Sequence, residues 1–262
     1  MRFLFPSDYF NPKKADAAYL EQVACVQSAG FATSLISLES LGTNSSKIIP
    51  LPEVGSKVVY RGWMLSPTDY ESLVSVIQST GANILTSQTD YLATHYIPNW
   101  YPLIVDLTPE TKFYSVDDDL ENELTKLEWN GFFIKDYVKS LKTSVGSVIN
   151  QPSEIKTVIA EMQKFRGNIE GGICVRQIED FLPETEKRYF VIYGQPFAAS
   201  PNEEIPEIVE ECARRIESKF FSVDVIERRD GNKRIVEIGD GQVSDLVGWT
   251  SERFTQCWVE LH

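Results

Sequence analysis

The stretch Phe221–Leu246, FSVDVIERRDGNKRIVEIGDGQVSDL, decides the fold of this chain because it predicts a β-hairpin with acidic residues near its ends. Apolar residues alternate over residues 221–225, and a second apolar run over 235–238 brings the chain back. The Asp230-Gly231 pair between them supplies a two-residue turn. We therefore expect two antiparallel strands here.

Three of the carboxylates in this stretch are candidate metal ligands. Asp224 on the outgoing strand and Glu237 on the returning strand are expected to lie side by side, and Asp240 is expected to swing toward them because Gly239 and Gly241 permit sharp backbone turns. Converging carboxylates suit Mg²⁺ with phosphate oxygens completing its shell. The alternative is a set of solvated charges around a turn, but a carboxylate inside an apolar run needs a partner or a metal.

Length, composition and charge limit the class of protein. With 262 residues and 42% hydrophobic content, the chain can bury the core of one large domain or of two to three lobes. The formal net charge of -13 argues against a nucleic-acid partner, since phosphate contacts need clustered Lys and Arg. No apolar run reaches the roughly 18 residues of a membrane span, and the N-terminus lacks a signal-peptide pattern, so we expect no membrane partner and a cytoplasmic protein.

Cysteine and histidine chemistry is not indicated. The four cysteines form no CxxC pair, so neither a zinc cluster nor a disulfide framework is predicted. His95 is the only histidine besides the terminal His262, and no GxSxG motif accompanies it, which argues against a Ser-His-Asp triad.

The first hundred residues predict a small α/β lobe with a parallel sheet. Strand-like runs occur at 1–10, 31–38, 57–60 and 82–85, with helical spacing over 15–29 and over 66–81, where Ser66 is the expected N-cap and Gly81 the stop. Ligands bind at the carboxyl ends of such strands. Asp8 after the first strand and Arg61 after the third are therefore candidate substrate contacts, although a surface arginine is an equally good reading of Arg61.

A basic segment lies in the middle of the chain. Residues 132–134 predict a strand followed directly by Lys135, and Lys139 and Lys142 precede a Ser/Gly-containing stretch at 143–147. Lysines beside a flexible loop hold the phosphates of bound nucleotides in many proteins, and the alternative is a solvated basic loop. Beyond it we expect a helix over 152–165 capped by Ser153, strands over 173–178 and 188–193 with an acidic connection between them, and a helix over 203–220.

Taken in order, these elements resemble the ATP-grasp fold over residues 125–250, and the EIGDGQVS ending resembles its R2K clade. The resemblance implies an α/β and α+β protein with antiparallel sheets in its second part. Residues 1–105 would form a pre-ATP-grasp-like α/β domain. Residues 106–262 would form the ATP-grasp domain, with nucleotide in the cleft between its two lobes.

The resemblance also implies roles for individual residues. Lys135 would contact the α- and β-phosphates of ATP, and Lys139 or Lys142 would lie in the loop that closes over the triphosphate. Arg188 would approach the γ-phosphate and the transferred acyl phosphate. The remaining implied positions are a further anion contact at Arg176, the adenine and ribose contacts at Gln177, Ile178 and Glu179, and the Mg²⁺ ligands Asp224, Glu237 and Asp240.

The implied activity is that of a carboxylate-amine ligase that uses Mg²⁺-ATP and an acyl-phosphate intermediate. Its substrates would be a small-molecule or peptide carboxylate and an amine acceptor, and a homodimer is the default assembly for a symmetric enzyme. The alternatives are a small-molecule kinase of the same fold, a non-catalytic nucleotide-binding interaction protein, and an acidic two-domain protein that binds no nucleotide. Each of these hypotheses in which the protein binds a nucleotide requires Lys135 to face Glu237.

Overall fold

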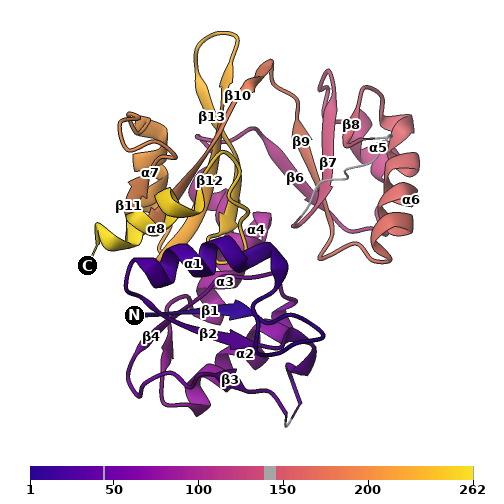
Figure 1. The fold of residues 1–262 in the computed structure, drawn as a ribbon. Helices are drawn as coiled ribbons and strands as arrows, with labels where there is room; N and C mark the ends of the chain where they lie inside the picture. Colours follow the sequence, from indigo (N-terminus) through magenta and orange to yellow (C-terminus); the bar gives the residue numbers. More distant parts are fainter. Residues whose placement is uncertain (44, 139–145, 262) are drawn as a thin grey trace. The chain divides into compact units, whose positions relative to one another are not determined.

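A computed structural model describes residues 1–43, 45–138 and 146–261. Its contacts group the chain into two compact units that interleave along the sequence (Figure 1). Unit 1 contains Met1–Thr94, Lys187–Asp224 and Gly239–His262, and unit 2 contains His95–Glu186 and Val225–Ile238. These units are defined by packing and are not the sequence domains 1–105 and 106–262 expected above, which stay a prediction.

The N-terminal part of unit 1 is built on a five-stranded sheet of order β3-β2-β1-β4-β5. Strand β1 pairs in parallel with both β2 and β4, and β4 pairs in parallel with β5, so the expected parallel sheet is confirmed. The short antiparallel strand β3 was not predicted. The bounds are β1 Arg2–Pro6, β2 Ala32–Ile36, β3 Ile48–Ile49, β4 Lys57–Tyr60 and β5 Asn83–Ile84.

Helices connect these strands, and the best predicted of them is α2 (Pro67–Ser79). The Ser66 hydroxyl accepts a hydrogen bond from the Asp69 N–H, and Pro67 occupies the first turn, where its missing N–H costs nothing. Gly81 follows the helix with φ 82°, a conformation that favours glycine. The other helical segments are η1 Ala17–Tyr19, α1 Leu20–Ser28, η2 Leu38–Ser40 and α3 Gln88–His95.

Unit 2 contains an antiparallel sheet of order β6-β9-β7-β8. Phe132 and Ile134 on β7 are buried in one apolar cluster with Leu124, Val158 and Met162 of α5 and α6. The bounds are α4 Ile97–Trp100, η3 Tyr101–Leu103, β6 Thr111–Tyr114, α5 Leu120–Thr125, β7 Phe132–Asp136, β8 Val148–Ile149, η4 Pro152–Glu154, α6 Ile155–Arg166 and β9 Ile173–Gln177.

The cap predicted at Ser153 is wrong. Gln151 and Glu154 form a capping box instead, in which the Glu154 carboxylate accepts the N–H groups of Asn150 and Gln151 at 2.8 and 2.9 Å. A single turn of 3-10 helix then leads into α6, so Ser153 lies inside the helical segment.

The third sheet has the order β11-β10-β12-β13 and contains the predicted hairpin. Gly231 closes its turn by donating to the Arg228 carbonyl at 2.9 Å, with φ 85°. The expected loop over 179–187 is wrong, because β10 runs without a break through most of this acidic stretch and Thr185 accepts the Glu227 N–H. The bounds are β10 Phe181–Ile192, β11 Gln195–Phe197, β12 Phe220–Arg228 and β13 Lys233–Asp240.

The last helix, α8 (Ser251–Val259), completes the core of unit 1 and was not predicted. Trp258 packs edge-on against Phe3 and Phe220, with ring centroids 5.4 and 4.9 Å away. Helix α7 (Glu207–Arg215) is shorter than expected because Pro206 precedes it and the chain turns extended at Ile216. Among the described residues, no helix combines the length and apolar character needed to span a bilayer.

Candidate functional site

Lys135 lies within β7 and not after it as expected, because the strand continues to Asp136 through pairing with β9. Its side chain is 4% exposed, and its Nζ is 3.6 Å from Oε1 of Glu237, whose side chain is 45% exposed. The expectation that Lys135 faces Glu237 is therefore confirmed. A buried ammonium group needs an anionic partner, and Glu237 presents one from β13.

Arg176 on β9 adds a second buried cation to unit 2. Its Nε donates to the Thr111 hydroxyl at 3.3 Å and its Nη1 to the Val236 carbonyl at 2.5 Å. Its Nη2 is buried without a hydrogen-bond partner among the described residues. Burial lowers the pKa of Arg176, and the nearby Glu237 charge opposes that shift. The buried, unsatisfied Nη2 of Arg176 favours a ligand that supplies an oxygen acceptor.

The segment expected to contact adenine and ribose begins at the end of β9 with Gln177, followed by the partly exposed Ile178. The Glu179 carboxylate accepts from Arg234 at 2.9 Å and lies 3.5 Å from Arg228. Both arginines belong to the hairpin, so Glu179 fixes this segment to β12 and β13. A role for Gln177, Ile178 and Glu179 in nucleotide binding stays a prediction.

In unit 1, Arg188 and Asp224 form a two-pronged ion pair. Nε and Nη2 of Arg188 donate to Oδ1 and Oδ2 of Asp224 at 2.7 and 2.6 Å. The side chains are 15% and 8% exposed. Arg188 Nη1 also donates to the Asp245 carbonyl at 2.9 Å. The predicted phosphate-binding arginine and the first predicted metal ligand are thus partners of each other.

The chain turns at Gly241, as expected, but not at Gly239. Strand β13 continues through Gly239 to Asp240, and neither glycine has a positive φ. Residues three apart on a regular strand point to opposite faces, so Asp240 is not redirected toward the side of Glu237. The assignment of Asp240 to a metal stays a prediction.

Asp240 is fully buried in a polar network of unit 1. Its Oδ1 accepts from the backbone N–H and the side-chain amide of Gln242, which in turn donates to the Tyr70 hydroxyl. Its Oδ2 has no hydrogen-bond partner among the described residues. Burial raises the pKa of Asp240 to about 7, while the bonds from Gln242 and the charge of Arg61 oppose the shift.

The predicted magnesium cluster is not assembled from protein groups alone. Within the described ranges, no three His, Cys, Asp or Glu side chains are arranged so that they could hold a metal ion. Lys139 and Lys142, expected in the phosphate loop, lie outside the described residues. Unit 2 therefore contains the cation-carboxylate pair Lys135–Glu237, and unit 1 contains the pair Arg188–Asp224.

Of the two expected substrate contacts, Asp8 has a local structural role. Its Oδ1 accepts the N–H groups of Phe10 and Asn11 and so shapes the turn after β1. A contact from Asp8 to substrate stays a prediction.

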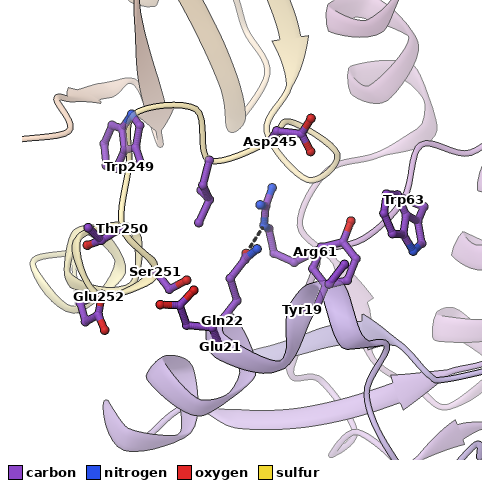
Figure 2. A pocket seen from close by; sticks show the side chains of 12 residues that line it. Tyr19, Glu21, Gln22, Arg61, Trp63, Asp245, Trp249, Thr250, Ser251 and Glu252 are labelled. Atoms are coloured by element: carbon purple, nitrogen blue, oxygen red, sulfur yellow. Dashed lines mark hydrogen bonds between the residues drawn. The ribbon is translucent and has the colours of Figure 1, made fainter.

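Arg61 lines a pocket of about 430 Å³ in unit 1, shown in Figure 2. Arg61 is 2% exposed, and its guanidinium carbon lies 4.7 Å from the centre of the Phe254 ring. The surface alternative for Arg61 is therefore wrong. The other lining residues are Ala18, Tyr19, Glu21, Gln22, Trp63, Asp245, Leu246, Trp249, Thr250, Ser251 and Glu252.

Of the residues that line this pocket, only Arg61 was predicted from the sequence. Trp63 stands two residues after Arg61 at the carboxyl end of β4, and Asp245 lies in the stretch that decides the fold. Each residue could have been singled out from its position in the sequence. That the two lie in one pocket with Arg61 could not be predicted, because the chain segments that form the pocket are far apart: Arg61 binds the carbonyl of Gly241, 180 residues later.

Comparisons with known proteins identify the family and the fold of the chain. Residues 102–258 match the family described as ATP-grasp domain, R2K clade family 3. The fold is similar to the crystal structure of D-cycloserine synthetase DcsG, with a TM-score of 0.65, 11% identity, and coverage of 100% of this chain and 99% of that chain. No match was found among curated proteins.

Two further structures share the fold. The ATP-grasp ligase PsnB, complexed with precursor peptide PsnA2 and AMPPNP, has a TM-score of 0.62 and 10% identity over 99% of this chain and 96% of that chain. The D-alanine-D-alanine ligase from Coxiella burnetii has a TM-score of 0.63 and 11% identity over 100% and 98% of the two chains. At these identities the likeness shows the fold alone.

Proposed function

Because this chain belongs to the ATP-grasp domain family of the R2K clade, family 3, we propose that it is an ATP-dependent ligase that joins a carboxylate to an amine. The observation that carries the proposal is the presence of two pairs, Lys135–Glu237 and Arg188–Asp224. Each pair joins a candidate phosphate-binding cation to a candidate metal-binding carboxylate. A magnesium-bound triphosphate carries both signs of charge and suits both members of each pair.

The side chains of unit 2 fit the phosphate groups of ATP. Lys135 supplies a buried positive charge, and Arg176 supplies a buried Nη2 without a partner in the described part of the chain. A phosphate oxygen would satisfy that donor, and the Glu237 carboxylate would then be released from Lys135. Gln177, Ile178 and Glu179 are the proposed adenine and ribose contacts, and Lys139 and Lys142 are further candidates for phosphate.

Asp224 and Glu237 are the proposed magnesium ligands because carboxylate oxygens are the donors that this ion prefers. Bound there, the ion would neutralise charge on the phosphate oxygens during transfer. Asp240 stays a further candidate, with its buried, unpartnered Oδ2 as the supporting feature. Arg188 would stabilise the transferred phosphoryl group once Asp224 has another partner.

The proposed reaction has two steps. A carboxylate oxygen of the substrate attacks the γ-phosphorus of ATP, and ADP leaves. The acceptor nitrogen then attacks the carbonyl carbon of the acyl phosphate, phosphate leaves, and the nitrogen loses a proton. Lys135, Arg176 and Arg188 would contribute by binding and orienting anionic groups, so no protein nucleophile is needed.

The proposed substrates are a small-molecule or peptide carboxylate and an amine. This choice is supported by PsnB, whose complex contains a precursor peptide, and by the D-alanine-D-alanine ligase, which share the fold. A cytoplasmic location, a homodimeric assembly and the absence of nucleic-acid and membrane partners remain predictions from the sequence.

The test is product analysis with Mg²⁺-ATP, candidate acids and candidate amines. A ligase releases ADP and phosphate only when both an acid and an amine are present, whereas a kinase leaves the phosphate on its substrate. Glu237→Ala should abolish turnover, and Glu184→Ala, at an exposed position on β10, should not change it. ATP binding without ADP formation under any condition would instead indicate an interaction protein.

A further inference from the structure

We propose that the pocket around Arg61 binds a free amino acid as its zwitterion, with the carboxylate on Arg61 and the ammonium group facing Glu21 and Asp245. The role of this amino acid as the acceptor amine rests on the proposed ligase function. The binding of the amino acid does not, because every residue of the pocket belongs to unit 1 and none of them is a residue proposed to contact nucleotide.

The guanidinium group of Arg61 is held in a fixed orientation. Nε donates to Gln22 Oε1 at 3.1 Å, and Nη1 donates to the carbonyls of Gly241 and Ser244 at 2.6 and 2.9 Å. Nη2 has no hydrogen-bond partner in the described part of the chain. Figure 2 shows the group pointing into the pocket between Gln22 and Asp245.

A carboxylate is the ligand group that this arginine fits best. Guanidinium donors bind carboxylate oxygens with charge-assisted hydrogen bonds, and the fixed geometry of Arg61 lowers the entropy lost on binding. Burial lowers the pKa of Arg61 to about 10, so the group remains charged at neutral pH.

The rest of the pocket has the opposite charge. Glu21 and Asp245 are exposed, and neither forms an ion pair with a described residue. Tyr19 and Trp63 pack edge to face, with ring centroids 5.5 Å apart, and add aromatic surface to the lining of the pocket. Carboxylates and aromatic rings together favour an ammonium group. A ligand with only a carboxylate would leave this part of the pocket unmatched.

A backbone segment connects the pocket to the proposed reaction centre within unit 1. Arg61 binds the carbonyl of Ser244, and Arg188 binds the carbonyl of the next residue, Asp245. The residue proposed to stabilise the transferred phosphoryl group and the residue proposed to hold the amino acid therefore bind neighbouring carbonyls of one short loop. This proximity is what an acceptor amine requires.

The first test uses changes in the ligand, so it does not depend on a variant that folds. The twenty common amino acids, in L and D form, are titrated into the wild-type protein by calorimetry without nucleotide. At least one should bind. Its carboxamide should bind roughly 10-fold to 150-fold more weakly, because a charged hydrogen bond is lost, and its N-acetyl derivative should also bind more weakly.

The second test uses the double variant Glu21→Gln/Asp245→Asn, which keeps the shape of two exposed side chains. It should weaken binding of the free amino acid by about 3-fold to 10-fold and leave binding of its N-acetyl derivative unchanged. The control variant Glu71→Gln/Glu204→Gln removes the same charge from exposed positions outside the pocket and should have no effect.

The outcomes separate this proposal from the proposed function. No binding by any amino acid up to about 10 mM, above the usual range of KM values, would overturn the pocket assignment, and so would equal binding of the free acid and its carboxamide. ADP release that depends on Glu237 would then still support the proposed ligase function. Amino-acid binding without ADP release under any condition would support the pocket and count against the ligase.

Discussion

Replacing Asp240 with Asn is expected to stabilise the protein at pH 8 and to change its stability little near pH 4. Asp240 is fully buried, and its Oδ2 has no hydrogen-bond partner among the described residues. Its negative charge is therefore poorly compensated in the folded state, although Gln242 and Arg61 reduce the penalty. Asn has nearly the same shape and no charge, so it removes that penalty.

The magnitude follows from the pKa shift. Burial raises the pKa of Asp240 from 3.8 to about 7. Three units correspond to about 4 kcal/mol at 1.36 kcal/mol per unit, which is an upper estimate. Because the pKa is raised on folding, the folded protein binds this proton more tightly than the unfolded chain. The stability that the protonated Asp240 gives the folded protein is fully present below the pKa of the unfolded chain, 3.8, and is lost as the pH rises to about 7.

The assay is urea denaturation of wild type and Asp240→Asn at about pH 4, 6 and 8. The difference in free energy of unfolding between the two proteins isolates Asp240, because their other titrating groups are shared. Asp117→Asn, at an exposed position, is the matched control and should show no pH-dependent difference.

A difference that does not vary with pH, or a variant that is less stable at pH 8, would refute this reasoning. A titration with Mg²⁺ and an ATP analogue tests the other role of Asp240. Weaker magnesium binding in Asp240→Asn without a gain in stability would show that the carboxylate is a metal ligand and not a buried acid of the fold.

Three further predictions concern the ion pairs and a helix cap. Lys135→Ala should weaken binding of an ATP analogue about 10-fold to 150-fold in calorimetry, because a charged contact to phosphate is lost. Lys126→Ala, at an exposed position, is the control and should not change the affinity. Equal affinities of wild type and Lys135→Ala would contradict the assignment of Lys135 to phosphate. Arg188→Ala should lower the free energy of unfolding by about 3–5 kcal/mol because it removes both hydrogen bonds from the arginine to the buried Asp224 carboxylate, and adding Asp224→Ala should recover part of the loss; additive losses in the denaturation cycle would argue against coupling. Glu154→Ala should destabilise the protein by about 1 kcal/mol in thermal unfolding through loss of the capping box, and an unchanged Tm would show that the box does not contribute.

The sequence predicted those elements that depend on local signals. The N-cap and stop of α2 and the DG turn of the hairpin are encoded within a few residues, and each is confirmed. The acidic stretch before Arg188 was misread because polar composition indicates a loop, whereas an exposed strand needs only a partner to supply its hydrogen bonds. That partner is β12, which is distant in the sequence.

The candidate site was only partly predictable for the same reason. The facing of Lys135 and Glu237 was expected from the resemblance to a known fold, and the structure confirms it. The direction of Asp240 depended on whether β13 ends before or after Gly239, which glycine content alone does not determine. The surroundings of Arg61 depended on contacts across most of the chain.

The position of α8 in unit 1 has a consequence for how the protein is made. Phe254 and Trp258 belong to the same apolar cluster as Phe3, yet they are translated long after it. During synthesis, strands β1 and β4 have an uncovered apolar face until α8 has left the ribosome, which is a state prone to aggregation. A premature stop before residue 251 would therefore leave unit 1 without a completed core.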